Sequence, residues 1–368
     1  MNKALNVALV ICMLWVSPAL GSVIDELPVV TATISFQNEV GDPLKGVKAR
    51  AGCSSFTRDA VLRDSGVSNA DGIRIFKLKA LTGIGVWTDK DGYYQSIAPA
   101  RNDHPFDERF RFDPFIYRDD VPRIAQKDPP MKKEVKLEAS ITLREIKNPI
   151  PLFVKRVRMD IPARDIWLDY DMEAGEWVKP YGQGVRADMR IRSAPKRLDP
   201  KVPHGVLLPG VASLEIDFGK HGGLIRVTKE NGWLAVSEMK MPHLAPEAGY
   251  EQLPILKIEQ TTFEDSSESV KANDSYFLPK ANGYFFRTRV KREGGKIVSA
   301  NYGKLMGRIN YVPVQRDGAW WGDEKKNAPA FGSIEFTYYL NPAANDLNLE
   351  FDVKKNLFKR SEQWIRQP

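Results

Sequence analysis

The sequence predicts an all-β protein in which an N-terminal β-sandwich is followed by a larger β-sandwich or jelly-roll-like domain. Many short runs alternate apolar and polar residues, which is the pattern of a strand with one buried face. Gly, Pro, Asn and Asp bound these runs, as they do at turns, and few stretches carry the helical period. The composition, 42% hydrophobic and 27% charged, is ordinary for a folded globular chain.

The first domain is expected to span residues 22–147. Ala98–Pro130 is long for an ordinary loop and is rich in charge, proline and aromatic residues. We expect it to wrap over the sandwich, because its Phe and Tyr side chains supply apolar anchors. The strands predicted in this domain are Val29–Phe36, Val47–Cys53, Ile73–Leu78, Ile84–Thr88 and Val135–Leu143.

A domain boundary is predicted at Asn148-Pro149-Ile150-Pro151, because two prolines remove backbone donors and disfavour both a helix and a central strand. The second domain is then 148–368, and the apolar residues of its tail, Asn341–Pro368, indicate that the tail packs. Its predicted strands are Pro151–Met159, Asp165–Tyr170, Gly184–Ile191, Ala212–Phe218, Gly223–Thr228, Leu253–Ile258, Gly283–Arg292, Lys304–Val314 and Phe331–Leu340.

Residues 1–21 have the pattern of a cleavable export signal. Lys3 precedes the apolar run Val7–Val16, and Ala19-Leu20-Gly21 is the small-x-small pattern of a cleavage site. An apolar core of about ten residues is shorter than the roughly twenty that span a bilayer. We therefore expect an exported protein, periplasmic or extracellular, with no transmembrane segment after cleavage; a retained N-terminal anchor is the alternative.

The chain has two cysteines, and Cys12 lies within the leader. Cys53 would then be alone in the mature protein, without an internal disulfide. It ends an alternating run and is expected to be a buried strand thiol, with a reactive thiol as the alternative. The mature fold must accordingly be stabilised by its β-sheet cores.

The formal net charge is +7. Lys155-Arg156-Val157-Arg158 and Arg190-x-Arg192 alternate with other residues, so these cations are expected on the solvent faces of strands. For an exported protein, a basic surface favours acidic glycans, anionic lipid headgroups or cell-wall polymers as partners, and no nucleic acid.

Three short motifs occur in order in the first domain: Gly41-Asp42-Pro43-Leu44-Lys45-Gly46-Val47, Ser68-Asn69-Ala70-Asp71-Gly72-Ile73, and Gly92-Tyr93. Each places a glycine where a turn needs a positive φ. In this order they resemble the carboxypeptidase regulatory-like domain, a prealbumin-like (transthyretin-like) β-sandwich, over roughly Val29–Ser96. The resemblance implies a module that is typically accessory, and no catalytic residue carries over from it.

The remainder of the chain resembles exported bacterial proteins to which no activity is attached. The segments that carry this resemblance are Asn148–Pro151, Tyr170–Trp177 with Pro180-Tyr181-Gly182, and Tyr339–Asp352. It implies export and supplies no site residue.

A carboxylate cluster lies beside aromatic residues near Trp167–Trp177. Asp171 and Glu176 are the candidate acid and base there, since a glycosidase needs a carboxyl pair and an aromatic platform. A solvated hairpin tip between two strands has the same composition, and we favour that interpretation.

Trp320 and Trp321 form the most suggestive binding feature, because adjacent residues on a strand point to opposite faces and one indole is then exposed. Trp177 and Tyr181 are the other candidate binding residues. The alternative is that one tryptophan belongs to the core and the other covers a sheet edge.

The four histidines do not fall at the spacing that places two imidazoles on one metal. A G-x-S-x-G nucleophile motif and a glycine-rich phosphate loop are not found either. We expect no metal and no cofactor. The sequence favours a non-catalytic protein of the cell envelope or extracellular space that binds glycan or another envelope component; the alternative is a secreted hydrolase acting on polysaccharide.

Overall fold

The computed structural model describes residues 27–52, 63–98, 110–113, 115–119, 122–123, 126, 129–163, 165–197, 210–251, 256–260, 282–312 and 333–358. This part of the chain forms strands and no α-helix, which confirms the predicted all-β fold. Because it has no helices, it holds none long and apolar enough to cross a membrane. The leader, Cys53, Trp320 and Trp321 lie outside the described residues.

The described residues divide into two compact units. Unit 1 contains those up to Lys147 together with Leu234–Met239, and unit 2 contains those of Asn148–Trp233 and those from Lys240 onward. The sequence predicts a second domain that is continuous from Asn148 to the end of the chain. The structure instead places the short segment Leu234–Met239 in the first unit.

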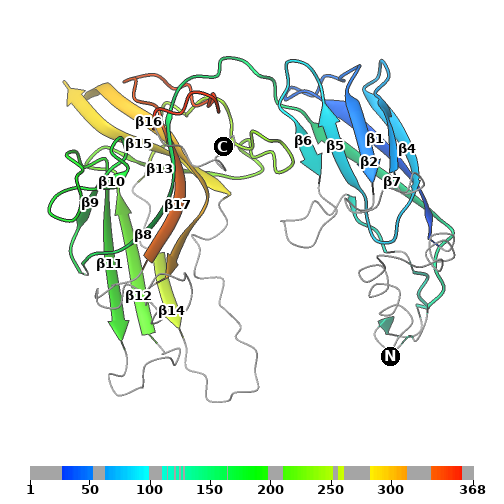
Figure 1. Ribbon diagram of the computed structural model, residues 1–368, viewed down its shortest axis with the longest axis horizontal. Helices are drawn as coiled ribbons and strands as arrows, with labels where there is room; N and C mark the ends of the chain where they lie inside the picture. Colours follow the sequence, from blue (N-terminus) through cyan, green and yellow to red (C-terminus); the bar gives the residue numbers. More distant parts are fainter. Residues whose placement is uncertain are drawn as a thin grey trace. The chain divides into compact units, whose positions relative to one another are not determined.

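Unit 1 is a β-sandwich (Figure 1). Its strands are β1 (Val29–Gln37), β2 (Lys48–Gly52), β3 (Arg63–Val67), β4 (Ile73–Lys79), β5 (Gly85–Asp89), β6 (Ser96–Ala98) and β7 (Glu134–Thr142). One sheet has three strands in the order β4-β1-β7, and the other has four in the order β3-β2-β5-β6. β1 and β7 run parallel, whereas β1 and β4 are antiparallel.

Alternation along the strands builds the core of unit 1. In β1 every second residue is buried, and the same rule directs Phe76 of β4 and Val86 of β5 into one cluster. Phe110, from the long segment after β6, is fully buried in that cluster.

Leu234–Met239 extends the four-stranded sheet of unit 1 beyond β6. The Ile97 amide donates to the Val236 carbonyl at 2.6 Å, and the Glu238 amide donates to the Gln95 carbonyl at 2.7 Å. The side chain of Val236 is buried in the unit 1 core. The edge of β6 is thus paired in the folded chain rather than left open.

Two turns of unit 1 interlock through Ser68, whose buried hydroxyl accepts from the Val47 amide at 2.9 Å and donates to the Leu44 carbonyl at 2.6 Å. Gly72 lies in the second of these turns and has a φ of +72°. A Cβ at Gly72 would lie 2.5 Å from the Phe36 carbonyl oxygen. The glycine is therefore required both by its backbone conformation and by the close approach of β1.

Unit 2 contains two five-stranded sheets, in the orders β10-β9-β11-β12-β14 and β13-β15-β16-β17-β8 (Figure 1). The strands of the first are β9 (Leu168–Asp171), β10 (Glu176–Trp177), β11 (Met189–Arg197), β12 (Gly210–Asp217) and β14 (Leu256–Gln260). Those of the second are β8 (Phe153–Asp160), β13 (Gly223–Val227), β15 (Gly283–Glu293), β16 (Lys296–Val312) and β17 (Ser333–Leu340). Residues of both sheets share one aromatic-rich core, which makes this unit sandwich-like as well.

The C-terminal tail of unit 2 packs where it is described. Leu349 and Phe351 are buried, and backbone bridges join Asn348 to Leu244 and Phe351 to Ile150. Residues far apart in the sequence therefore meet along this tail.

Replacement of Gly72 by Ala is expected to destabilise the protein more than replacement of Gly92 by Ala. Both positions have positive φ and pay a left-handed penalty of about 1–2 kcal/mol. At Gly92 the added methyl meets nothing within 4 Å, whereas at Gly72 it meets backbone atoms of two segments. Urea unfolding should give a loss of about 3 kcal/mol for Gly72→Ala and about half of that for Gly92→Ala. Equal losses would mean that the turns do not interlock as described.

Candidate binding groove on the four-stranded sheet

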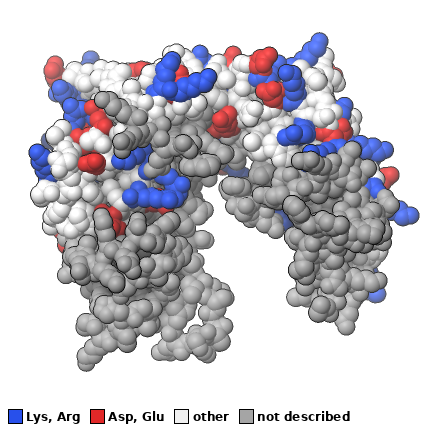
Figure 2. Space-filling view, viewed as in Figure 1, with Lys and Arg blue, Asp and Glu red and all other residues white. Residues whose placement is uncertain are grey.

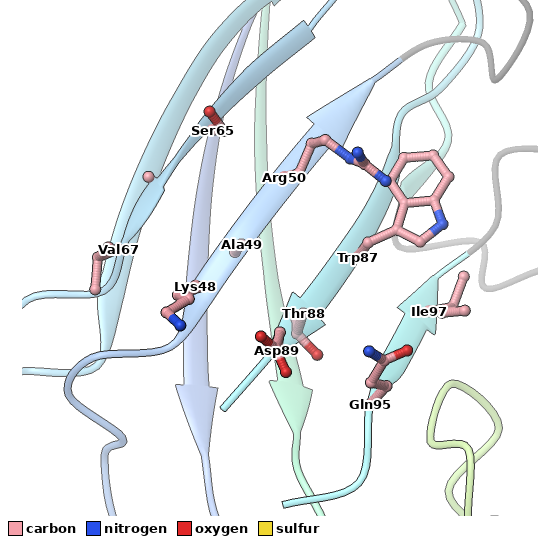
Figure 3. A pocket seen from close by; sticks show the side chains of 11 residues that line it. Lys48, Ala49, Arg50, Ser65, Val67, Trp87, Thr88, Asp89, Gln95 and Ile97 are labelled. Atoms are coloured by element: carbon pink, nitrogen blue, oxygen red, sulfur yellow. The ribbon is translucent and has the colours of Figure 1, made fainter. Parts of the chain in front are cut away.

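A shallow groove of about 450 Å³ lies on the outer face of the β3-β2-β5-β6 sheet. This volume is within the range of small-ligand sites. Alternation places buried residues such as Ala49 and Val86 beneath the sheet and leaves the intervening side chains on the groove side. Figure 3 shows side chains of all four strands around the groove.

Strand register aligns the groove side chains in two rows. The first, here called the aromatic row, crosses the sheet as Ser65, Arg50, Trp87 and Ile97, which are successive partners on β3, β2, β5 and β6. The second, the polar row, pairs Val67 with Lys48 and Lys48 with Asp89.

The indole of Trp87 lies along its own strand over Gly85. A Cβ at Gly85 would be 2.9 Å from the ring, so only glycine leaves room for this placement. The Arg50 guanidinium lies 5.4 Å from the centre of the Trp87 ring, within the range of a cation–π contact. Figure 3 shows Arg50 reaching from β2 toward Trp87 on β5. Ile97, 41% exposed, extends the apolar surface on the far side of the ring.

The charged side chains of the groove make no ion pair with any other residue in the described part of the chain. This holds for Arg50, Lys48 and Asp89, although Lys48 and Asp89 are cross-strand neighbours. Across the molecule, by contrast, Figure 2 shows Lys and Arg interspersed with Asp and Glu on the face in view. The groove thus offers an aromatic ring beside polar groups that are available to a ligand.

Trp87, Arg50 and Lys48 are not among the site residues predicted from the sequence. The sequence pattern that could have indicated them is the alternation of Lys48 with Arg50 and of Trp87 with Asp89, since the residues between them are buried. What the sequence could not supply was the register that brings Arg50 opposite Trp87.

Asp171, a candidate acid or base under the alternative hydrolase interpretation, is buried, and its carboxylate accepts hydrogen bonds from four backbone amides. One oxygen accepts from the amides of Glu173 and Ala174 at 3.0 and 2.9 Å, and the other accepts from those of Val185 and Arg186 at 3.0 and 3.1 Å. Burial by itself raises the pKa of Asp171, but these four hydrogen bonds outweigh it and lower the pKa. The carboxylate organises its turn and has no proton to donate at neutral pH.

The other candidate residues of this region lie in different environments in the structure. Glu176 pairs with Asp171 across β9 and β10, is exposed, and accepts a hydrogen bond from the Gln183 amide at 3.3 Å. Trp177 is buried in the core, with its indole nitrogen donating to the Asp160 carbonyl at 3.3 Å, so no ring face is left for a sugar. Tyr181 is 43% exposed on the loop that follows β10.

Within the described residues there is no group of three or more His, Cys, Asp or Glu side chains placed to hold a metal ion. Trp320 and Trp321 lie outside these residues, and their role as a binding platform stays a prediction.

No known family model and no curated protein matches the chain. Solved structures that are similar in part include the 3-chlorocatechol 1,2-dioxygenase of Rhodococcus opacus, with 10% identity, a TM-score of 0.23 and coverage of 33% of this chain and 62% of that one. Catechol 1,2-dioxygenase of Acinetobacter radioresistens has 11% identity, a TM-score of 0.23 and coverage of 36% and 56%. The chain thus spans less than two thirds of either dioxygenase.

A candidate carbohydrate-binding protein of Bacteroides uniformis matches over 87% of this chain and 100% of its own, with 8% identity and a TM-score of 0.18. At these identities and TM-scores, none of the solved structures assigns a function.

Replacement of Asp171 by Asn is expected to cost about 2–3 kcal/mol at pH 7, because the amide NH₂ would face backbone N–H donors. The pKa of Asp171 is lower in the folded chain than the value of about 3.9 in an unfolded one. The ionised Asp171 carboxylate therefore stabilises the fold above about pH 4, and this stabilisation disappears as the pH falls through the folded-state pKa.

Urea unfolding of both proteins at pH 7 and at pH 2–3 checks this expectation, with Glu176→Gln as the exposed control. The difference in the free energy of unfolding between the wild type and Asp171→Asn should become smaller at acid pH. A gap that stays constant with pH would contradict the assigned role.

Proposed function

We propose that this protein is an exported, non-catalytic carbohydrate-binding protein whose ligand lies in the groove of unit 1. The observation that carries the proposal is the indole of Trp87, laid flat over Gly85 on an outward sheet face. The apolar face of a pyranose packs on such a ring, while hydroxyl groups bond to side chains beside it. Ser65, Gln95 and Asp89 line the groove and supply donors and acceptors.

The shape of the groove suits a chain better than a buried small molecule. Its lining residues come from all four strands of the sheet, and its wall includes exposed side chains such as Val67 and Ile97. A shallow surface of this kind lets a polymer enter from the side and continue beyond the contact. Such a surface supports retention of a polysaccharide rather than chemistry on it.

The same proposal assigns unit 1 to the carboxypeptidase regulatory-like, prealbumin-like class. Support comes from its sheets of three and four strands and from the motif glycines. Gly41, Gly46, Gly72 and Gly92 have φ values of +93°, +79°, +72° and +80°. Export, with removal of residues 1–21, is part of the proposal and rests on the leader pattern.

Trp87→Ala is expected to weaken binding to glycan ligands by tenfold or more, the equivalent of about 1.4 kcal/mol or more. The test is a glycan array with the purified mature chain, followed by calorimetric titration of the best ligand. Trp167→Ala is the matched control, because Trp167 is an exposed indole of unit 2 that also lies beside arginine. It should bind as the wild type does. The proposal fails if no glycan binds, or if the two variants lose affinity equally.

A further inference from the structure

Two sites in the described chain combine a partly exposed tryptophan with arginine. In unit 1 the guanidinium of Arg50 approaches Trp87 at 5.4 Å. In unit 2 the guanidiniums of Arg190 and Arg192 approach Trp167 at 5.3 and 5.0 Å. Both sites place arginine near a tryptophan ring, so they can be compared by whether the arginine is already paired with a carboxylate.

The unit 2 site is internally neutralised. Arg190 forms an ion pair with Asp217, and Arg192 forms one with Glu215, its neighbour across β11 and β12. A guanidinium that is already held by a carboxylate has little to gain from an anionic ligand. The arginines of this site therefore form cross-strand ion pairs that stabilise the pairing of β11 and β12.

The unit 1 site is not neutralised within the described residues. The cross-strand neighbours of Arg50 are Ser65 and Trp87, and neither of them carries a charge. Arg50 is exposed, and its five N–H donors form a fork that matches a carboxylate or a sulfate. Lys48, two residues earlier on the same face of β2, adds a second cation.

The Arg50 guanidinium carbon lies 5.4 Å from the centre of the Trp87 ring, so the ring and the cation are close enough to contact one ligand together. A pyranose on the indole would present an equatorial substituent to Arg50.

Asp89 fixes the polarity of the groove. It follows Trp87 by two residues on the same face of β5 and lies opposite Lys48. Asp89 and Lys48 offset each other at one end of the groove, whereas Arg50 gives the other end a net positive charge that attracts an oxyanion. One arrangement of an anionic sugar is thus favoured over its reverse.

We propose, resting on the carbohydrate-binding function above, that the groove selects saccharides that carry an oxyanion on the stacked pyranose, with Trp87 holding the ring and Arg50 the charge. The shared chemistry is a carboxylate of a uronic acid or a sulfate ester. Lys48 contributes mainly to long-range attraction, and Asp89 sets the orientation.

The test uses three probes of equal length: galacturonate oligomers, the same oligomers with their carboxyl groups reduced to alcohols, and sulfated galactose oligomers. The variants are Arg50→Met, Trp87→Ala and the control Lys136→Met. Lys136 is an exposed cation on β7, in the other sheet of unit 1, so its replacement removes the same charge away from the groove. Titrations are run at low and at physiological salt.

Wild type is expected to bind at least one anionic probe tenfold or more tightly than the reduced probe, and added salt should narrow that gap. Arg50→Met should lose roughly tenfold or more on the anionic probe and less than threefold on the reduced one. Lys136→Met should match the wild type on every probe. Preference for galacturonate or for the sulfated probe identifies the source of the oxyanion.

The inference is overturned if Arg50→Met and Lys136→Met lose affinity equally, because attraction would then be a property of net charge alone. It is also overturned if wild type binds the reduced and anionic probes equally. In that case a loss with Trp87→Ala would still uphold carbohydrate binding in the groove. If no probe binds and the glycan array is also negative, both proposals fail.

Discussion

The ion pair between Asp188 and Arg289 is the interaction on which the packing of unit 2 depends. The Asp188 carboxylate is fully buried, and both of its oxygens accept from the Arg289 guanidinium at 2.6 Å. The Met172 amide donates to the same carboxylate at 3.0 Å. Arg289 has a φ of +55° where the register of β15 shifts. The bulge thus aims a cation from one sheet at the turn of the other, and loss of Arg289 would leave the buried Asp188 carboxylate without a cationic partner.

The need to pair buried charges explains which charged residues remain available to a ligand. The described residues contain no α-helix and so have no helix ends at which to place charge, and their buried aspartates are met by backbone amides or arginine. Asp171 and Asp188 are both committed in this way. The cluster that resembles a glycosidase centre in the sequence is therefore the framework of a turn. Arg50, in contrast, faces outward beside Trp87 with no carboxylate partner in the described chain, which is what a recognition surface requires.

How much could be predicted from the sequence depended on whether the information was local. The alternating pattern of β1 identifies it as a strand from the local sequence alone, and its predicted and observed bounds differ by one residue. Strand β3 (Arg63–Val67) is polar and partly exposed along its length, so no alternation marks it. The predicted strand Gly184–Ile191 begins later, at Met189, because the preceding residues bend around the Asp171 carboxylate. Trp177 was misleading for a related reason: its indole nitrogen donates to the Asp160 carbonyl of β8, in the other sheet, and only the tertiary structure shows that contact.

The groove itself is a consequence of register. A slip of one residue in β5 would turn Trp87 into the core and bring its buried neighbours to the surface. The buried hydroxyl of Thr88 opposes such a slip, because it donates to the Ser96 carbonyl at 3.1 Å and accepts from the Ser96 amide at 3.0 Å. This pair fixes β5 against β6 and so holds Trp87 opposite Ile97. On the other side, pairing with β2 sets Arg50 opposite the same ring. The proposed recognition surface is thus positioned by buried polar contacts between β5 and β6.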